Sequence, residues 1–259
     1  MQNELSMSIL RIYTLSIREI KRFIKVYHQT IIAPVISALI FLSIFYLSMG
    51  KYTTKINNVD YIDFIGYGLI IISIIQNSFA NSSSSIIMSK VLGYISDLIV
   101  TPFSGYEIVI SYVIGSIFRG ILIGILVALF LSPVVTYNLN HGFLLIFIIF
   151  NSTIFMGLVG VLAGLVTNNF DQNSAVTNYV IMPMSFLSGT FYSIKNLPIY
   201  FQYFNIINPF FYIIDSFRYC FINNSDGNIT FGILYISFLN IILFLISAHL
   251  FNIGWKIKQ

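Results

Sequence analysis

Residues 142–166 read GFLLIFIIFNSTIFMGLVGVLAGLV, a run of 25 residues that contains no charged side chain. The hydrocarbon core of a bilayer is about 30 Å thick, so a helix needs roughly 20 apolar residues to cross it. A segment in lipid must also satisfy its own backbone hydrogen bonds, which a helix does and an open strand does not. This run therefore predicts a transmembrane helix.

Five further apolar runs have a similar length: residues 31–49, 62–87, 107–131, 175–194 and 230–251. Of the 259 residues, 57% are hydrophobic and 8% are charged, against about 25% charged in ordinary soluble domains. We therefore predict an all-α integral membrane protein with six transmembrane helices, which form a single membrane domain over residues 1–259. A lone cysteine, Cys220, excludes an internal disulfide, and no basic patch outside the N-terminal segment suggests nucleic-acid binding.

The distribution of Lys and Arg predicts the orientation, because cytoplasmic loops carry an excess of these residues. With the N-terminus inside, eight basic residues fall on the cytoplasmic face and four on the outer face. The cytoplasmic set is Arg11, Arg18, Lys21, Arg22, Lys25, Lys90, Lys256 and Lys258. We therefore expect both termini to be cytoplasmic.

The segment 9–27 precedes the first apolar run and has helical periodicity. Apolar side chains such as Ile9, Ile17 and Ile24 recur at helical spacings, and basic residues lie between them. These basic residues are Arg18, Lys21, Arg22 and Lys25. The pattern predicts an amphipathic helix along the membrane interface. It serves either as a positively charged anchor or as an element that a cytoplasmic partner pushes.

The loop 88–104 is the longest cytoplasmic segment between two spans. Its apolar run after Lys90 predicts a short helix, which carries Asp97 and ends at Thr101-Pro102. Such a helix either docks into a groove of another protein or lies on the membrane.

Polar side chains within the spans are costly unless they are partnered. Gln76, Asn77 and Asn81 either join helices by hydrogen bonds or line a translocation path. Arg119 lies twelve residues after Glu107, so about 18 Å along the helix. Its depth predicts a buried partner, for which the candidates are Asn151, Asn178, Asn240 or a phosphate of the substrate. Small residues at 116, 120 and 124, and at 157, 160 and 164, predict close helix packing.

The segment 189–223 is apolar, but Gly189, Pro198 and Pro209 interrupt it. Each proline suits the first turn of a new helix, with Asn196 or Asn208 near the N-cap position. Pieces of half the length of a span predict a re-entrant or interfacial helical hairpin between helices 5 and 6 on the outer face; the alternative is one poorly formed extra span. Asp215 and Arg218, at i and i+3, are expected to pair.

Motifs for catalysis and metal binding are missing from the sequence. It has no phosphate-binding loop of the GxxxxGK[ST] type, and its three histidines have no metal-ligand spacing. No two carboxylates lie together in the middle of a span, which disfavours the alternative function, an ion-coupled secondary transporter or channel. We expect neither an enzyme nor a metal site.

The segment from Phe186 to Ser193, FLSGTFYS, together with Leu197-Pro198 and Asn208-Pro209, resembles ABC-2 type permeases, as does the order of the spans. These are the membrane subunits of ABC exporters in the bacterial inner membrane, and the multidrug-type branch is the most similar. Many relatives have a Trp soon after the Leu-Pro, where this chain has Tyr200 and Phe201.

The resemblance implies a homodimer in membrane lipid that moves an amphipathic or lipid-linked substrate outward by alternating access. ATP and Mg would be held by a separate ABC ATPase subunit, with no cofactor on this chain. Residues 9–27 would be the connecting helix, and residues 189–223 the outer hairpin. The coupling contact to the ATPase would involve Lys90, Gly93, Asp97, Thr101 and Pro102.

Overall fold

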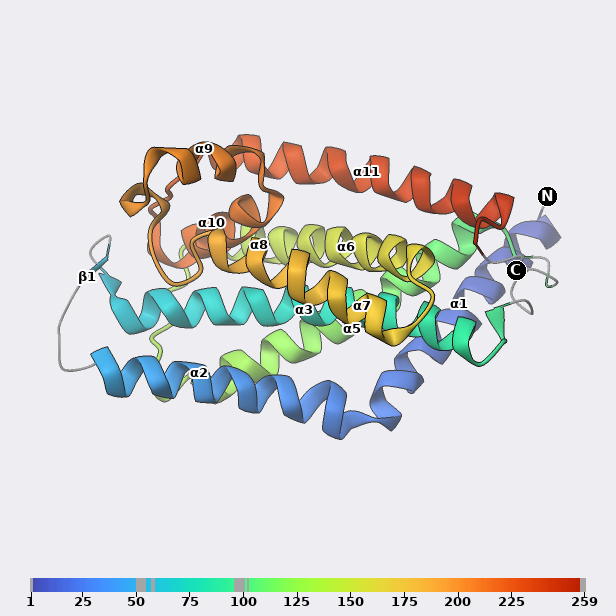
Figure 1. Ribbon diagram of the computed structural model, residues 1–259, viewed down its shortest axis with the longest axis horizontal. Helices are drawn as coiled ribbons and strands as arrows, with labels where there is room; N and C mark the ends of the chain where they lie inside the picture. The colour runs from blue at the N-terminus through green and yellow to red at the C-terminus, as the bar shows by residue number, and fades with distance from the viewer. Residues whose placement is uncertain (1, 50–54, 57–58, 96–100, 102, 257–259) are drawn as a thin grey trace.

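The computed structural model describes residues 2–49, 55–56, 59–95, 101 and 103–256 of the chain. The long helices lie side by side in a bundle, and both ends of the chain lie at the same end of it (Figure 1). The elements are α1 (Gln2–Lys25), η1 (His28–Ile32), α2 (Ala33–Met49), β1 (Lys55–Ile56), β2 (Val59–Asp60), α3 (Tyr61–Val91), α5 (Gly105–Leu131), α6 (Gly142–Val166), α7 (Phe170–Val176), η2 (Thr177–Ile181), α8 (Met182–Leu187), η3 (Ile194–Asn196), α9 (Ile199–Ile207), α10 (Pro209–Ile222) and α11 (Ile229–Ile253). The strands β1 and β2 form a two-residue antiparallel ladder before α3.

Within the described part of the chain, five helical segments are long and apolar enough to cross a membrane. They are His28–Ser48, Tyr61–Val91, Gly105–Leu131, Gly142–Val166 and Ile229–Ile253. These segments coincide, within a few residues, with five of the six predicted runs. Long apolar runs locate such helices well because the requirement for lipid burial acts on local composition.

The predicted span over residues 175–194 is placed wrongly. Helical structure runs instead through α7, η2 and α8, from Phe170 to Leu187. The π-helical turn η2 ends two residues before Pro183, which has no N–H for the regular helical ladder. The helix ends before Gly189, whose φ of +82° turns the chain away. A second π-helical turn, η1, precedes Pro34 in the same way.

The helix α3 is the centre of the bundle. In its most apolar window 89% of the residues are buried, against 22% in the segment that contains α2 and 17% in α11. It packs against both α5 and α6, which also contact each other. The small residues of these two helices make this packing possible, as predicted: a Cβ at Gly120 would collide with Ser78 Oγ of α3, and one at Gly160 with Ser82 Oγ.

Polar side chains of α3 join the neighbouring helices at the same contacts. The hydroxyl of Ser78 donates to the carbonyl oxygen of Ser116 (3.2 Å), and that of Ser82 donates to the carbonyl oxygen of Gly157 (2.7 Å). These bonds form because the glycines allow the backbones to approach closely. The small residues and the serines therefore act together to hold α3 between α5 and α6.

Candidate functional site

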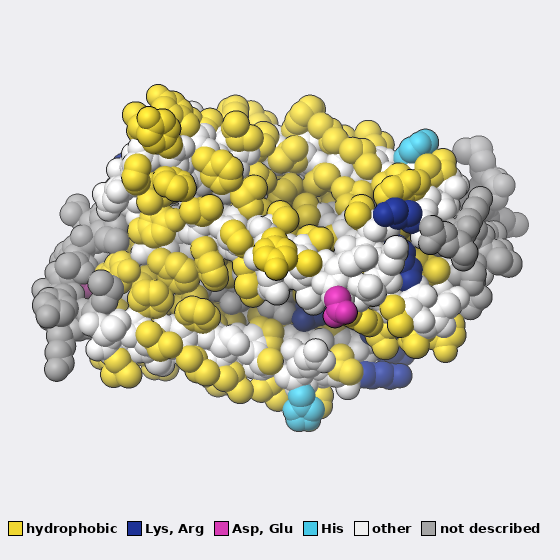
Figure 2. Space-filling model, in the orientation of Figure 1, with side chains coloured by type: hydrophobic (Ala, Val, Ile, Leu, Met, Phe, Trp, Pro, Cys, Tyr) yellow, Lys and Arg dark blue, Asp and Glu magenta, His cyan; other side chains and the backbone are white. Residues whose placement is uncertain are grey.

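A groove of about 540 Å³ runs along one side of the bundle, and we call it the lateral groove. Its walls are formed by α2, α3 and the η2–α8 segment; the lining residues are Gln29, Ala33, Pro34, Ser37, Ala38, Phe41, Leu69, Ile72, Ser73, Gln76, Asn77, Phe79, Ala80, Thr177, Ile181, Met182, Phe186 and Phe191. Figure 2 shows a hollow between the helices of this face. The walls are mainly apolar, and half of the six polar lining residues, Ser73, Gln76 and Asn77, belong to α3.

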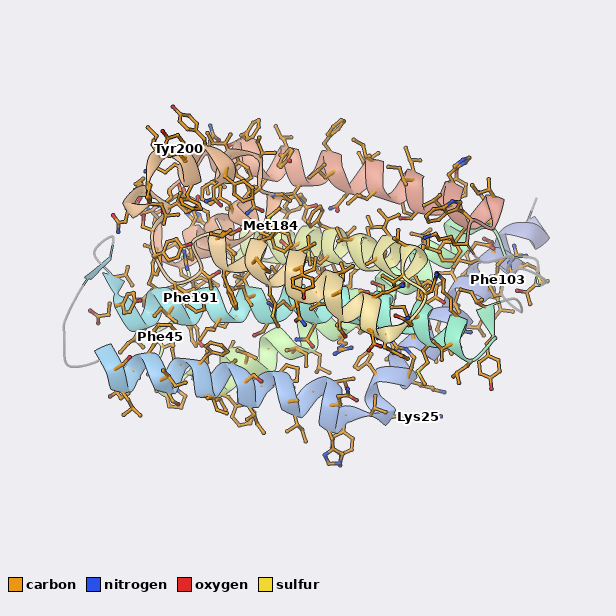
Figure 3. The ribbon with its side chains drawn as sticks, in the orientation of Figure 1. Lys25, Phe45, Phe103, Met184, Phe191 and Tyr200 are labelled. Carbon is orange, nitrogen blue, oxygen red and sulfur yellow. The ribbon has the colours of Figure 1, made fainter. Side chains whose placement is uncertain are left out.

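Aromatic rings line and close one end of the lateral groove. Phe191 stacks on Phe45 of α2, with ring centroids 5.2 Å apart, and Phe186 lies 5.6 Å from Phe191. Figure 3 shows Phe45 and Phe191 at the end of the bundle opposite the termini. Stacked and tilted rings stabilise such contacts beyond the burial of their area. The groove therefore has an aromatic end and a more polar middle.

Two of the four predicted path residues, Gln76 and Asn77, lie on the wall of this groove. Arg119 lies behind the wall: it is 6% exposed, and its Nη2 donates to Asn77 Oδ1 at 3.1 Å. None of the three amides that we expected to bind Arg119 does so; Asn240 Nδ2 donates to Asn151 Oδ1 instead (2.6 Å), and Asn178 is exposed. A buried arginine in a span costs between ~3 and more than ~10 kcal/mol, and one neutral amide compensates only part of this cost.

The fourth path residue, Asn81, is fully buried and contacts α1 instead of the groove. Arg22 Nη2 donates to its carbonyl oxygen (2.8 Å) and to its Oδ1 (3.1 Å). Arg22 Nε also donates to Glu19 Oε2 at 3.2 Å, and Glu19 is only 1% exposed. Asn77 and Asn81 are one helical turn apart, about 6 Å along α3. The arginine of α1 and the arginine of α5 thus hold adjacent turns of the same helix.

The helix α1 begins at Gln2, earlier than the predicted residue 9, and presents three different faces. Leu15, Glu19 and Phe23 are buried against the bundle, whereas Ile9 and Ile24 are exposed. Arg18, Lys21 and Lys25 lie between these two faces in the helical register. An exposed apolar face beside a basic face is the arrangement of a helix that lies in a membrane interface.

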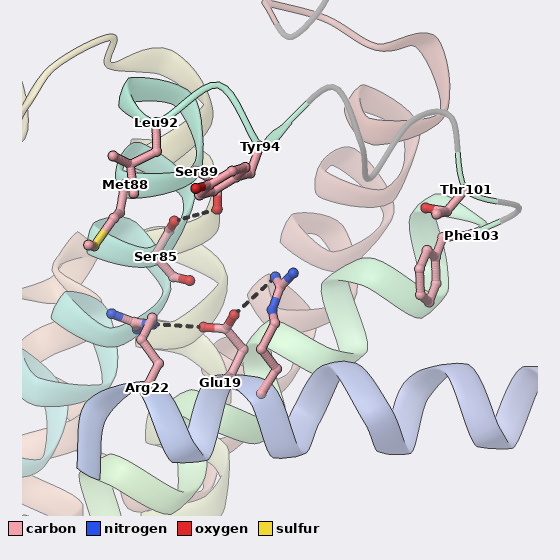
Figure 4. Close-up of a pocket in the computed structure, with 10 residues that line it drawn as sticks. Glu19, Arg22, Ser85, Met88, Ser89, Leu92, Tyr94, Thr101 and Phe103 are labelled. Carbon is pink, nitrogen blue, oxygen red and sulfur yellow. Dashed lines mark hydrogen bonds and ion pairs between the residues drawn. The ribbon is translucent and has the colours of Figure 1, made fainter. Parts of the chain in front are cut away.

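A second hollow, the terminal cleft, of about 460 Å³ lies between α1 and the end of α3, at the end of the bundle that holds both termini. Its lining residues are Arg18, Glu19, Arg22, Ser85, Met88, Ser89, Leu92, Tyr94, Thr101 and Phe103. Figure 4 shows Glu19 and Arg22 rising from α1 toward Ser85 of α3. The ion pairs of Glu19 form the floor of this cleft, so that a contact made there reaches α3 through Arg22.

The predicted docking residues fall in three different places. Lys90 belongs to the last turn of α3, and its Nζ donates to the carbonyl oxygens of Leu165 (2.6 Å) and Thr167 (2.9 Å) at the end of α6. Gly93 follows with φ of +79°, and Thr101 lines the terminal cleft. Asp97 and Pro102 lie outside the described residues. The chemistry of Lys90 is therefore that of a C-terminal cap on α6.

The segment 189–223 contains two short helices, α9 and α10, which meet at Asn208-Pro209. Asn208 is the N-cap of α10 and accepts from the Phe210 N–H (3.1 Å), whereas Asn196 is not a cap: α9 begins after Pro198. These two prolines lie at helix starts because a proline there removes no needed hydrogen bond.

Asp215 and Arg218 do not form the expected ion pair; each binds backbone groups of a different loop. Asp215 accepts from the N–H groups of Asp226 and Gly227, both at 2.9 Å. Arg218 is fully enclosed, donates to the carbonyl oxygens of Gly189 (2.7 Å) and Thr190, and lies 3.7 Å from the ring centroid of Phe64. Because α10 is packed between both loops, their unpaired backbone groups are closer partners than the side chain one turn away. The two residues together fasten the loops on both sides of α10.

The roles of Glu19 and of the aromatic end of the lateral groove were not predicted from the sequence. Glu19 had one signal, since it is the sole carboxylate of the basic segment 9–27 and lies at i, i+3 from Arg22. Phe45 and Phe191 had none, because the contact depends on how two distant segments pack. A metal site is absent among the described residues, where no group of three His, Cys, Asp or Glu side chains gathers.

Comparison with known proteins places this architecture in a family. The model of the ABC-2 type transporter family matches residues 11–222. The inner membrane transport permease YadH of Escherichia coli K12 is 32% identical over 244 residues, which cover 93% of this chain and 92% of the relative. The proteins of the same name from Escherichia coli O157:H7 and Shigella flexneri match with the same identity and coverage. The chain therefore belongs to the ABC-2 type transporter family.

Proposed function

We propose that this protein is the membrane-embedded permease subunit of an ATP-driven exporter, and that it moves an amphipathic or lipid-linked substrate outward. The observation that carries the proposal is the lateral groove, whose apolar walls and few polar groups match an amphipathic molecule in shape and chemistry. Family membership supports transport, and the sequence has no phosphate-binding loop of its own. ATP and Mg²⁺ would therefore be bound by a separate ABC ATPase subunit, and this chain needs no cofactor.

In this proposal the ATPase docks at the terminal cleft and moves α1 relative to the bundle. The movement passes through Arg22 to Asn81 of α3, because the guanidinium holds both the backbone and the side chain of that residue. Asn77 lies one turn further along and borders the groove. A displacement of α3 therefore reaches the groove without passing through a flexible loop, and alternating access results from the change in its walls.

The same proposal gives the protein six spans, with the α7–η2–α8 segment as the fifth and α9–α10 as an outer re-entrant hairpin. The α7–η2–α8 segment has 18 helical residues, from Phe170 to Leu187, which give a helix about 27 Å long. An even number of spans agrees with the two termini at one end of the bundle (Figure 1). The basic residues of α1 support a cytoplasmic location for that end, and the name of the relatives supports the bacterial inner membrane.

We further propose that two copies of the permease pair across the lateral groove. The α2 side of the bundle exposes large apolar side chains, such as Ile36, Ile40 and Phe41, beside the open groove. A second copy would complete a pathway that one bundle leaves open on this side. Two ATPases would then act on one homodimer.

Purification with a co-expressed ATPase encoded beside the gene tests the proposal. We expect a complex of two permeases and two ATPases, in which transport into inverted vesicles requires ATP and survives the collapse of proton and sodium gradients. Transport that survives ATP depletion but stops when these gradients collapse would favour an ion-coupled carrier instead. Failure to form a complex with every encoded ABC ATPase would refute the proposed assembly.

A further inference from the structure

Arg119 carries a charge that no described carboxylate balances. The ion pairs among the described residues are Arg11–Glu107, Arg18–Glu19, Arg22–Glu19 and Lys195–Asp226, and Arg119 is in none of them. Glu19, the carboxylate held one turn away at Asn81, already binds two arginines. Buried charges in proteins are normally paired, so this guanidinium, which has no carboxylate partner among the described residues, is suited to receive a counter-charge from a bound ligand.

The hydrogen-bonding groups of Arg119 lead to the same conclusion. Its Nη2 binds Asn77 Oδ1, whereas its buried Nε has no partner. Guanidinium groups bind phosphate and carboxylate oxygens through paired N–H donors. Asn77 satisfies one of these donors and at the same time borders the lateral groove. It therefore stands between the charge and the space that a ligand would occupy.

The groove supplies the other half of the recognition. Away from Asn77 its walls carry Phe41, Phe186 and Phe191, which lead to the aromatic end closed by Phe45. An apolar chain lies favourably along these rings, and an acidic headgroup at the other end of the same molecule reaches the polar middle of the groove. The two features lie on one side of the bundle and suit one molecule.

We propose that the lateral groove binds an anionic amphiphile, whose phosphate or carboxylate group pairs with Arg119 after displacing the oxygen of Asn77, and whose apolar chain lies along Phe41, Phe186 and Phe191. The inference rests on the proposed role of the groove as the substrate path, and it specifies the chemical class of the substrate. Asn77 is a gate in this arrangement: its oxygen holds Arg119 while the groove is empty, and its amide nitrogen is retained by the carbonyl oxygen of Ser73 (2.9 Å).

Equilibrium binding to the full-length permease in phosphatidylcholine nanodiscs tests the proposal without the ATPase. The probe is radiolabelled dodecyl phosphate, and dodecyl maltoside is the neutral comparison. We expect the phosphate to bind about tenfold or more tightly than the maltoside, because a hydrogen bond between two charged groups is roughly twice as strong as one between neutral groups. Arg119→Gln should abolish this preference, and Arg119→Lys should keep part of it. Asn151→Ala, which alters a buried amide of α6 away from the groove, is the matched control and should keep the preference.

Equal binding of the two amphiphiles by the wild-type protein would overturn the inference, as would an unchanged preference in Arg119→Gln. If Arg119→Gln elutes as an aggregate, the inference is still tested by the preference of the wild-type protein for dodecyl phosphate and by the reduced preference expected of Arg119→Lys. Phosphatidylglycerol added to the nanodiscs separates two sources of the anion: competition with dodecyl phosphate identifies the headgroup of a bilayer lipid, and its absence identifies another phosphate-bearing amphiphile. Since no ATPase is present, a failed complex with the ATPase and a failed binding preference are independent results.

Discussion

Replacement of Gly160 by alanine tests the packing at the centre of the bundle. A Cβ at this position would lie 2.5 Å from the carbonyl oxygen of Phe79 and against Ser82 Oγ. Ordinary contacts need about 3.5 Å, so α3 and α6 must separate by about 1 Å. Overpacking of this kind costs ~1–3 kcal/mol, and the bond from Ser82 to Gly157 loses up to ~1 kcal/mol. The higher helix propensity of alanine offsets at most ~1 kcal/mol of this cost, so we expect the free energy of unfolding to fall by ~1–3 kcal/mol.

The assay is reversible unfolding of the detergent-solubilised protein by dodecyl sulfate, followed by circular dichroism. Gly142→Ala is the matched control, since it lies on the same helix and a Cβ there meets only Leu139 Cδ2 at 3.5 Å. This control should change the free energy of unfolding by less than ~0.5 kcal/mol. A Gly160→Ala variant as stable as the wild type would show that α3 and α6 are not in close contact.

Three further predictions concern the ends of the bundle. Lys90→Met removes two hydrogen bonds to the end of α6 and should lower the unfolding free energy by ~1–3 kcal/mol, whereas Lys256→Met, which removes one exposed bond, should change it less in the same unfolding assay. In the complex with the ATPase, Arg22→Ala should lower transport-coupled ATP hydrolysis, and Asn81→Ala should lower it less, because it leaves the bond from Arg22 to the carbonyl oxygen of residue 81. The double variant should lower the rate no further than Arg22→Ala alone, because that change already removes the whole contact; additive losses would contradict this coupling. Burial raises the pKa of Asp215 from 3.8 to about 6, so the folded state takes up a proton more readily than the unfolded state. The stability contributed by this group should therefore increase as the pH falls from about 7 toward 4. Asp215→Asn should flatten this dependence in unfolding midpoints measured across that range, and an unchanged slope would show that Asp215 is not its cause.

The fold was predictable to the extent that it depends on local composition. A helix that must be buried in lipid needs an uninterrupted apolar run, and residues 142–166 satisfy this condition on their own. The predicted bounds of the span 175–194 were wrong because Pro183 and Gly189 change the backbone geometry without changing the apolar composition. An average over side chains does not register the π-helical turn that a proline requires.

The candidate site was predictable in its residue types and not in its contacts. Buried amides and a buried arginine indicated a polar centre, and Gln76 and Asn77 do line the lateral groove. The partner of Arg119 depended on the rotation of α3 and α5 about their axes, which is set by the packing of Gly120 against Ser78. For the same reason the sequence did not show that Asn81 faces α1, or that Lys90 reaches the end of α6.

The most direct test is a distance across the lateral groove in the working complex. Nitroxide labels are attached at Ser37→Cys of α2 and Thr177→Cys of η2, on opposite walls of the groove, in a Cys220→Ser background. Pulsed electron paramagnetic resonance then measures the distance between the two labels with and without trapped ATP. We predict that ATP shifts this distance in the otherwise wild-type complex, and that Arg22→Ala abolishes the shift while ATP still binds. A distance that is the same in both nucleotide states of the wild-type complex would contradict the proposal that the groove is the path opened by the ATPase.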